Sequence, residues 1–99
     1  MRHTRSEPRK VFLCRITITW ESETDGLKSQ SGLLEDRSRS GAGVSVDDPI
    51  PVGTAVKIRG RKRELSAIVK YCYPKNMRYL VGVRYDEVDE GWATIRAGL

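Results

Sequence analysis

The amino-acid sequence predicts an all-β fold, a six-stranded antiparallel β-barrel followed by a short C-terminal helix. Short apolar runs are separated by turn-forming residues at regular spacing, and no strand–helix alternation appears. The first run alternates strictly between apolar and polar residues, which indicates a half-buried strand. The 99 residues fit one domain with a modest core. Closure into a barrel removes strand edges that so small a domain has no other means to cover.

The first strand is predicted over residues 11–21, where apolar and polar residues alternate without a break. Period-two alternation with β-branched residues is typical of a strand that buries one face. A loop at residues 22–26, with the turn pair Asp25-Gly26, leads to a second strand predicted over residues 28–36. The side chains on the apolar face of the first strand are Phe12, Cys14, Ile16, Ile18 and Trp20.

Further strands are predicted over residues 42–46, 54–59, 63–73 and 78–85. The prolines of residues 47–53 lack the backbone donor that a central strand needs, so this stretch is predicted to be a connection. The chain is expected to turn at Pro74-Lys75-Asn76. Alternation places two sets of side chains in the core, namely Leu65, Ala67, Val69 and Tyr71 in the fifth strand and Tyr79, Val81, Val83 and Tyr85 in the sixth.

The two ends of the chain are predicted to differ from the barrel. Residues 1–10 are polar and charged, so they are expected to form a flexible arginine-rich arm, and residues 11–99 to form the barrel domain. Near the other end, acidic residues precede Trp92, Ile95 and Leu99 at helical spacing, which predicts a short helix that caps the barrel. No apolar run is long enough to span a membrane, and no secretory signal is recognised, so the protein is expected to be cytoplasmic.

The chain is basic, because 18 Lys and Arg residues against 13 Asp and Glu residues give a net charge of +5. The excess is uneven: cations crowd the arm and the cluster Arg61-Lys62-Arg63, which is remote in sequence from the arm, and acids gather at residues 86–90. Uneven basicity favours a phosphate-bearing partner, although a solvated surface is the commoner meaning of one charge run. Cys14 and Cys72 have no metal-ligand spacing, so they are interpreted as small apolar side chains, and no metal or cofactor is expected.

A polar segment at residues 35–43 separates the second and third predicted strands. Within it, Asp36 and Ser38 are two residues apart, so on an extended chain they project from the same face. Gly41 exposes bare backbone close by. An acceptor, a hydroxyl and bare backbone are what a polar ligand needs at the mouth of a barrel. The alternative from turn chemistry alone is an ordinary Asx or Ser turn that closes a hairpin.

A second feature lies upstream, where Arg5 and Arg9 are spaced as Arg-x-x-x-Arg. Together with Asp36-x-Ser38-x-x-Gly41, this spacing resembles the two signatures of the PilZ domain, the bacterial receptor for cyclic di-GMP. The resemblance extends over residues 2–86, because later segments also follow that family's pattern. It implies a cyclic di-GMP receptor or adaptor that regulates a protein partner, and not an enzyme.

The resemblance also implies a role for each motif residue. Arg5 and Arg9 would donate from their guanidinium groups to guanine and phosphate, and Asp36 would accept from the donor edge of a guanine. Ser38 would hydrogen-bond nearby, and Gly41 would admit the ligand against the backbone. The arm would close over a ligand at the barrel mouth, and charge-assisted hydrogen bonds would offset its loss of conformational entropy.

Two positions depart from the family pattern. Arg37 stands where relatives usually have an apolar residue, and alternation places it with Leu33 and Glu35, facing either solvent or a ligand phosphate. Thr4 stands where many relatives have another arginine, which leaves open whether one ligand molecule or a stacked pair is bound.

The sequence also bears on other classes of function. A PilZ-like module that works through protein contacts and does not bind the nucleotide is the main alternative, because Arg37 is unusual. A small basic barrel that binds single-stranded nucleic acid would need exposed aromatic platforms, whereas the tryptophans and tyrosines are predicted to pack in the core. An enzyme is not supported, since His3 is alone in the arm and no nucleophile has a base at a recognisable spacing.

Overall fold

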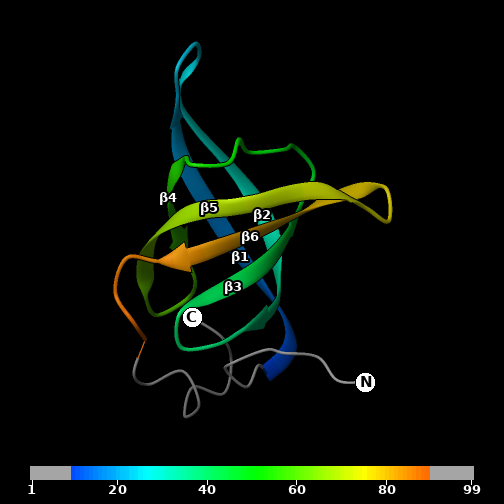
Figure 1. Ribbon diagram of the computed structural model, residues 1–99, viewed down its shortest axis with the longest axis vertical. Helices are drawn as coiled ribbons and strands as arrows, with labels where there is room; N and C mark the ends of the chain where they lie inside the picture. Colours follow the sequence, from blue (N-terminus) through cyan, green and yellow to red (C-terminus); the bar gives the residue numbers. More distant parts are fainter. Residues whose placement is uncertain (1–9, 90–99) are drawn as a thin grey trace.

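The computed structural model describes residues 10–89 of the chain, with side chains from Cys14 onward. It confirms a closed antiparallel barrel in which the strand order is β1-β2-β3-β6-β5-β4 and β4 returns to β1 (Figure 1). The expected arm and the expected C-terminal helix lie outside the described residues. The strands are β1 (Lys10–Ser22), β2 (Gly26–Arg37), β3 (Gly41–Val46), β4 (Ala55–Arg59), β5 (Glu64–Lys75) and β6 (Arg78–Tyr85).

The core lies inside the barrel and is built by alternate residues of every strand. Ile18 of β1, Val44 of β3 and Val81 of β6 are fully buried, as the alternation predicts for inward-facing residues. Cys14 is partly buried and packs against this core, so its interpretation as an apolar side chain is confirmed. Residues 10–89 form no helix that is long and apolar enough to cross a membrane.

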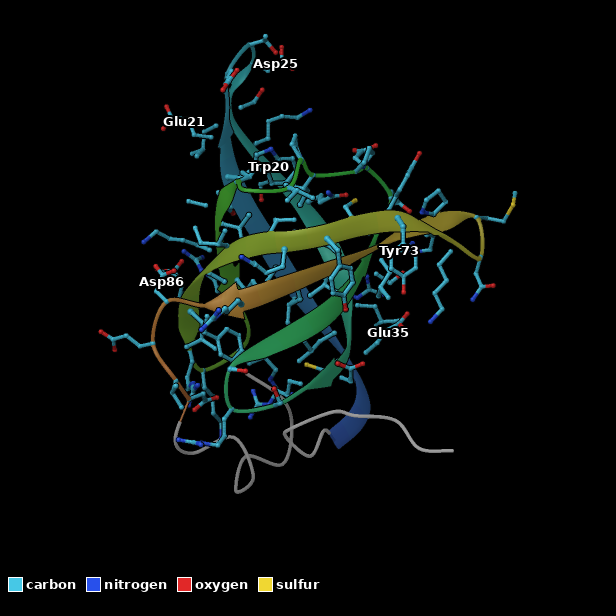
Figure 2. The ribbon with its side chains drawn as sticks, viewed as in Figure 1. Trp20, Glu21, Asp25, Glu35, Tyr73 and Asp86 are labelled. Carbon is cyan, nitrogen blue, oxygen red and sulfur yellow. The ribbon has the colours of Figure 1, made fainter. Side chains whose placement is uncertain are left out.

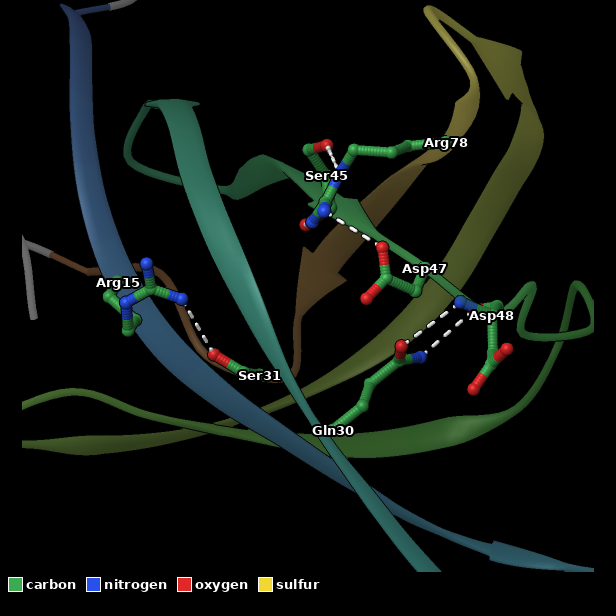
Figure 3. Close-up of polar contacts among 7 residues, drawn as sticks. All are labelled: Arg15, Gln30, Ser31, Ser45, Asp47, Asp48 and Arg78. Atoms are coloured by element: carbon green, nitrogen blue, oxygen red, sulfur yellow. Dashed lines mark hydrogen bonds and ion pairs between the residues drawn. The ribbon is translucent and has the colours of Figure 1, made fainter.

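Side-chain hydrogen bonds hold the strands together where the backbone ladders end (Figure 3). The β2–β3 ladder stops at Gly32 and Val46, and beyond it the Gln30 amide bonds both the N–H and the C=O of Asp48, at 3.0 and 2.9 Å. Arg78 donates to Ser45 Oγ at 2.8 Å and forms an ion pair with Asp47 at 2.8 Å, which joins β6 to the end of β3. The β1–β2 and β5–β6 hairpins project beyond the barrel wall (Figure 1).

A β-bulge in β2 and another in β5 interrupt the alternation. In β2, Leu34 pairs with Val44 and Asp36 with Gly43, so Glu35 is an extra residue. In β5, Val69 pairs with Val83 and Tyr71 with Gly82, which makes Lys70 the extra residue. Each bulge exchanges the inner and outer faces for the residues that follow it.

The bulges overturn two expectations from simple alternation. Arg37, expected beside Leu33 and Glu35, is instead fully buried, so its side chain does not face solvent. Tyr71, expected in the core, is 41% exposed on the outer face. The tyrosines of β6 do follow the prediction, because Tyr85 is buried and Tyr79 packs against the core.

The turn between β5 and β6 lies later than expected. Pro74 and Lys75 continue β5 and pair with Tyr79 and Arg78, so the turn residues are Asn76 and Met77. Both have positive φ, 53° and 68°, as a two-residue hairpin of this twist requires. Asn tolerates this conformation well, but the fully exposed Met77 does not, since its Cβ crowds the backbone.

We expect Met77→Gly to stabilise the protein by about 0.5–1 kcal/mol, because glycine relieves the left-handed strain and no packing is lost. Urea unfolding measures the change. Met77→Ala is the matched control, since alanine removes the same exposed side chain and keeps the strain. Equal stabilities for the two variants would contradict this account of the turn.

Candidate functional site

The polar segment that follows β2 lies where three strands meet at the lower end of the barrel in Figure 1. Val11 of β1 and Gly43 of β3 pair with Asp36 from opposite sides. Lys10 likewise pairs with Arg37. The start of β1 therefore lies directly beside the motif of Asp36, Ser38 and Gly41. Arg5 and Arg9 precede β1 in the sequence and lie outside the described residues.

Residues 38–41 form a hydrogen-bonded turn. The Ser38 N–H donates to the Gly41 carbonyl at 2.8 Å, and the Ser40 N–H donates to Ser38 Oγ at 3.4 Å. The Ser38 side chain thus has the turn-closing role that its chemistry alone predicts, and only 3% of the residue is exposed. It follows the last residue of β2, so strand alternation with Asp36 does not extend to it.

Gly41 is required by the packing of the strands. A Cβ at this position would overlap the carbonyl of Val83 in β6, because the two backbones pass very close to each other. This close approach needs glycine whether or not a ligand binds, which is a different reason from the one that the motif suggested.

Asp36 presents its carboxylate on the outer face of the barrel. The bulge at Glu35 places Asp36 outward, over Gly43 of β3. A Cβ built on Gly43 would lie 3.4 and 3.6 Å from the two carboxylate oxygens, so the carboxylate lies against Gly43, which is buried. Arg37 is buried on the opposite side of the same strand.

A row of paired residues connects Asp36 to an exposed aromatic pair, and both glycines in this row are buried. Across the sheet, Asp36 pairs with Gly43, Gly43 with Gly82, and Gly82 with Tyr71. The Tyr71 ring occupies the place where a side chain of Gly82 would be. The distance from β2 to β5 along this row is three strand spacings, about 14 Å. We call these four residues the glycine lane.

The aromatic end of the glycine lane is a stacked pair of tyrosines. The rings of Tyr71 and Tyr73 lie 5.6 Å apart at an interplanar angle of 20°. Tyr73 is 47% exposed and lies toward the same side of the view as Glu35 in Figure 2. Sequence reasoning missed both residues as surface groups. The signal that could have found them is a glycine inside each of β3 and β6, which often marks a close approach.

A hollow of about 290 Å³ adjoins the glycine lane. Leu33 and Leu80 contribute apolar lining, and Arg15, Lys75 and Arg78 make the surroundings basic. Glu35 is the acidic residue of the lining, with its Oε1 3.9 Å from Lys75 Nζ. The remaining lining residues are Ser45 and Asn76.

Comparison with known proteins identifies the fold family. The family model described as PilZ domain matches residues 3–97, nearly the whole chain. The structure of the Bacillus subtilis inhibitor of motility (MotI/DgrA) is similar, with a TM-score of 0.62 and 20% sequence identity. The similarity covers 91% of this chain and 46% of that one, so this chain spans about half the length of that protein. No curated protein sequence matches the chain.

We expect Gly82→Ala to displace the Tyr71 ring and to abolish its stacking on Tyr73, because the new methyl group occupies the place of the ring. The ring is 41% exposed, so its displacement removes little buried packing and the loss of stability should stay below about 1.5 kcal/mol. Tyrosine ring resonances in an NMR spectrum report the displacement. Arg84→Ala, at the next outward position of β6, is the control, and unchanged tyrosine resonances in Gly82→Ala would contradict the packing described.

Proposed function

Because the chain belongs to the PilZ domain family, we propose that it binds cyclic di-GMP on the outer face of its barrel and passes the signal to a protein partner. The observation that carries the proposal is the register of β1 on β2. Val11 pairs with Asp36 and Lys10 pairs with Arg37. Arg9 is therefore the residue that directly precedes this pairing in the chain. Arg5 must lie within about 18 Å of Lys10, since each residue spans at most about 3.6 Å.

Asp36 supplies the acceptor for one guanine. Its carboxylate lies on the outer face beside Gly43, where it would accept from the N1 and N2 donors of the base. Hydrogen bonds from neutral donors to a charged acceptor are stronger than neutral pairs and favour guanine over bases without two adjacent donors. Arg5 and Arg9 supply guanidinium groups for phosphate and for the acceptor edge of guanine.

The exposed tyrosines add a surface on which a base can stack. The Tyr71 ring lies over Gly82 and the Asp36 carboxylate lies beside Gly43, and these two glycines pair across neighbouring strands. A flat base lying on Tyr71 would gain about 1–3 kcal/mol from stacking. Asp36 and Tyr71 would then contact the same bound dinucleotide.

Binding of the ligand would recruit the arm. Residues 1–9 carry both arginines, so the site is complete only when this segment lies over the ligand. A change in the arm is a signal that a protein partner can read, which suits a binding module. The similarity to the inhibitor of motility concerns the fold alone.

We expect cyclic di-GMP to bind the wild-type protein in calorimetry and linear GMP to bind far more weakly.

Asp36→Asn should weaken cyclic di-GMP binding by about 1.5–3 kcal/mol, roughly ten- to a hundredfold in Kd, because a charge-assisted hydrogen bond is lost. Arg9→Ala should abolish measurable binding. Glu35→Gln, one residue away on the same strand, is the matched control for charge. No heat and no shift of the thermal midpoint at millimolar ligand would overturn the receptor function.

Hydrogen exchange tests the role of the arm. Amides of residues 2–9 should exchange more slowly once cyclic di-GMP is bound, since the ligand orders the segment that carries Arg5 and Arg9. Amides inside β3 and β6 should be protected equally with and without ligand, because their ladders do not depend on it. Arm amides that are already protected without ligand would contradict closure, even if cyclic di-GMP bound.

The stacked tyrosines also suit single-stranded nucleic acid, which makes this the second candidate. The two functions differ in salt dependence, because a nucleic acid strand releases many counterions on binding. Titration with a short single-stranded oligonucleotide at two salt concentrations distinguishes them. Tight binding of the oligonucleotide with a steep salt dependence, together with weak binding of cyclic di-GMP, would favour the second candidate.

A further inference from the structure

A segment from the opposite end of the described chain holds the turn that contains Ser38. We call residues 85–89, at and after the end of β6, the strap. The Tyr85 N–H donates to the Ser40 carbonyl and the Asp89 N–H donates to the Arg39 carbonyl, both at 2.7 Å. In Figure 1 the strap is the orange segment that turns away from the end of β6 and runs down beside the barrel.

The strap is anchored at Asp89 by an ion pair. Asp89 Oδ2 lies 2.7 Å from Nη2 of Arg63, and the Asp89 side chain is only 3% exposed while that of Arg63 is 32% exposed. Burial of a carboxylate costs free energy unless a charged partner compensates it. The guanidinium of Arg63 therefore stabilises the buried position of the Asp89 carboxylate. A second link holds the start of the strap, where the Asp86 N–H donates to the Ser66 carbonyl of β5 at 2.9 Å.

Arg63 comes from an element that is far from the motif in sequence. It closes the turn between β4 and β5, in which the Gly60 N–H donates to the Arg63 carbonyl at 2.9 Å. Arg61 and Lys62 of the same basic cluster are exposed, whereas Arg63 is partly buried beside Asp89. Arg63 therefore differs from its two neighbours in the basic cluster, because it forms an ion pair with Asp89.

We infer that Arg63 and Asp89 are positioning residues for the cyclic di-GMP site, an inference that rests on the function proposed above. The pair fixes the strap, and the strap fixes the carbonyls of Arg39 and Ser40. These carbonyls belong to the turn that aligns Ser38 and Gly41, so the shape of the ligand site depends on a contact outside it. Neither residue need touch the ligand.

The same connection implies a route for the signal. If a fixed strap favours ligand binding, then bound ligand must favour the fixed strap by the same factor, because coupling is reciprocal. The strap leads directly into the chain beyond residue 89. Occupancy of the site would therefore be sensed at the strap, in addition to the arm.

The first experiment uses the ligand-free protein, so it does not depend on the proposed function. In Arg63→Gln, amide exchange at Tyr85 and Asp89 should become about tenfold faster than in wild type, while amides inside β1 and β2 keep their protection. Arg61→Gln removes the same charge from the same turn and should leave both amides unchanged. Arg63→Lys, which keeps the charge, should restore part of the protection. Unchanged exchange at both amides in Arg63→Gln would overturn the anchoring role.

The second experiment measures cyclic di-GMP affinity by calorimetry, well below the melting temperature of each variant. Arg63→Gln and Asp89→Asn should each weaken binding about tenfold, and the double variant should be no worse than either single one, because the two residues act as a unit. Arg61→Gln should bind like wild type. Equal losses in Arg61→Gln and Arg63→Gln would indicate general charge and contradict positioning. A wild-type protein without affinity refutes the receptor function itself, while the exchange data still decide whether the pair anchors the strap.

Discussion

The bulges at Glu35 and Lys70 are the constraint on which the outer surface depends. Each inserts one residue into its strand and thereby reverses which of the following side chains face outward. The first turns Asp36 to the surface and Arg37 to the interior, and the second turns Tyr71 out over Gly82. Without the bulges, the carboxylate and the aromatic ring would not both lie on the outer face of the sheet.

The candidate site is therefore built from backbone as much as from side chains. Glycines at positions 43 and 82 leave space for the Asp36 carboxylate and the Tyr71 ring, and glycine at position 41 allows β6 to approach the turn. The turn itself has hydrogen bonds to its own residues and to the strap, with the Arg63–Asp89 ion pair behind it. A rigid barrel thus carries a short polar turn whose position is set by contacts from several distant elements, which suits a site that must respond to a ligand.

Sequence patterns predicted the strands and most of the core, because the alternation in β1 matches the burial of its side chains from Cys14 onward. The motif residues Asp36, Ser38 and Gly41 were predicted from the family resemblance, and the structure places Asp36 near the end of β2 and the other two in the turn that follows. Arg37 and Tyr71 were assigned to the wrong faces, since a bulge leaves no clear mark in a pattern of polar and apolar residues. The contact between Arg63 and Asp89 was also missed, because it joins residues that only the closed barrel brings together.

We propose that cyclic di-GMP binds on the outer face, where the side chains of Asp36 and Tyr71 lie over the glycine lane. Amide chemical shifts of the ¹⁵N-labelled protein, followed by NMR during a titration with cyclic di-GMP, test it most directly. The largest changes in chemical shift should occur at the amides of Gly43, Gly82 and Tyr71. The chemical shifts of the β4 amides, on another side of the barrel, should not change. Shifts confined to β4 or to the β1–β2 hairpin, with the lane unchanged, would contradict it.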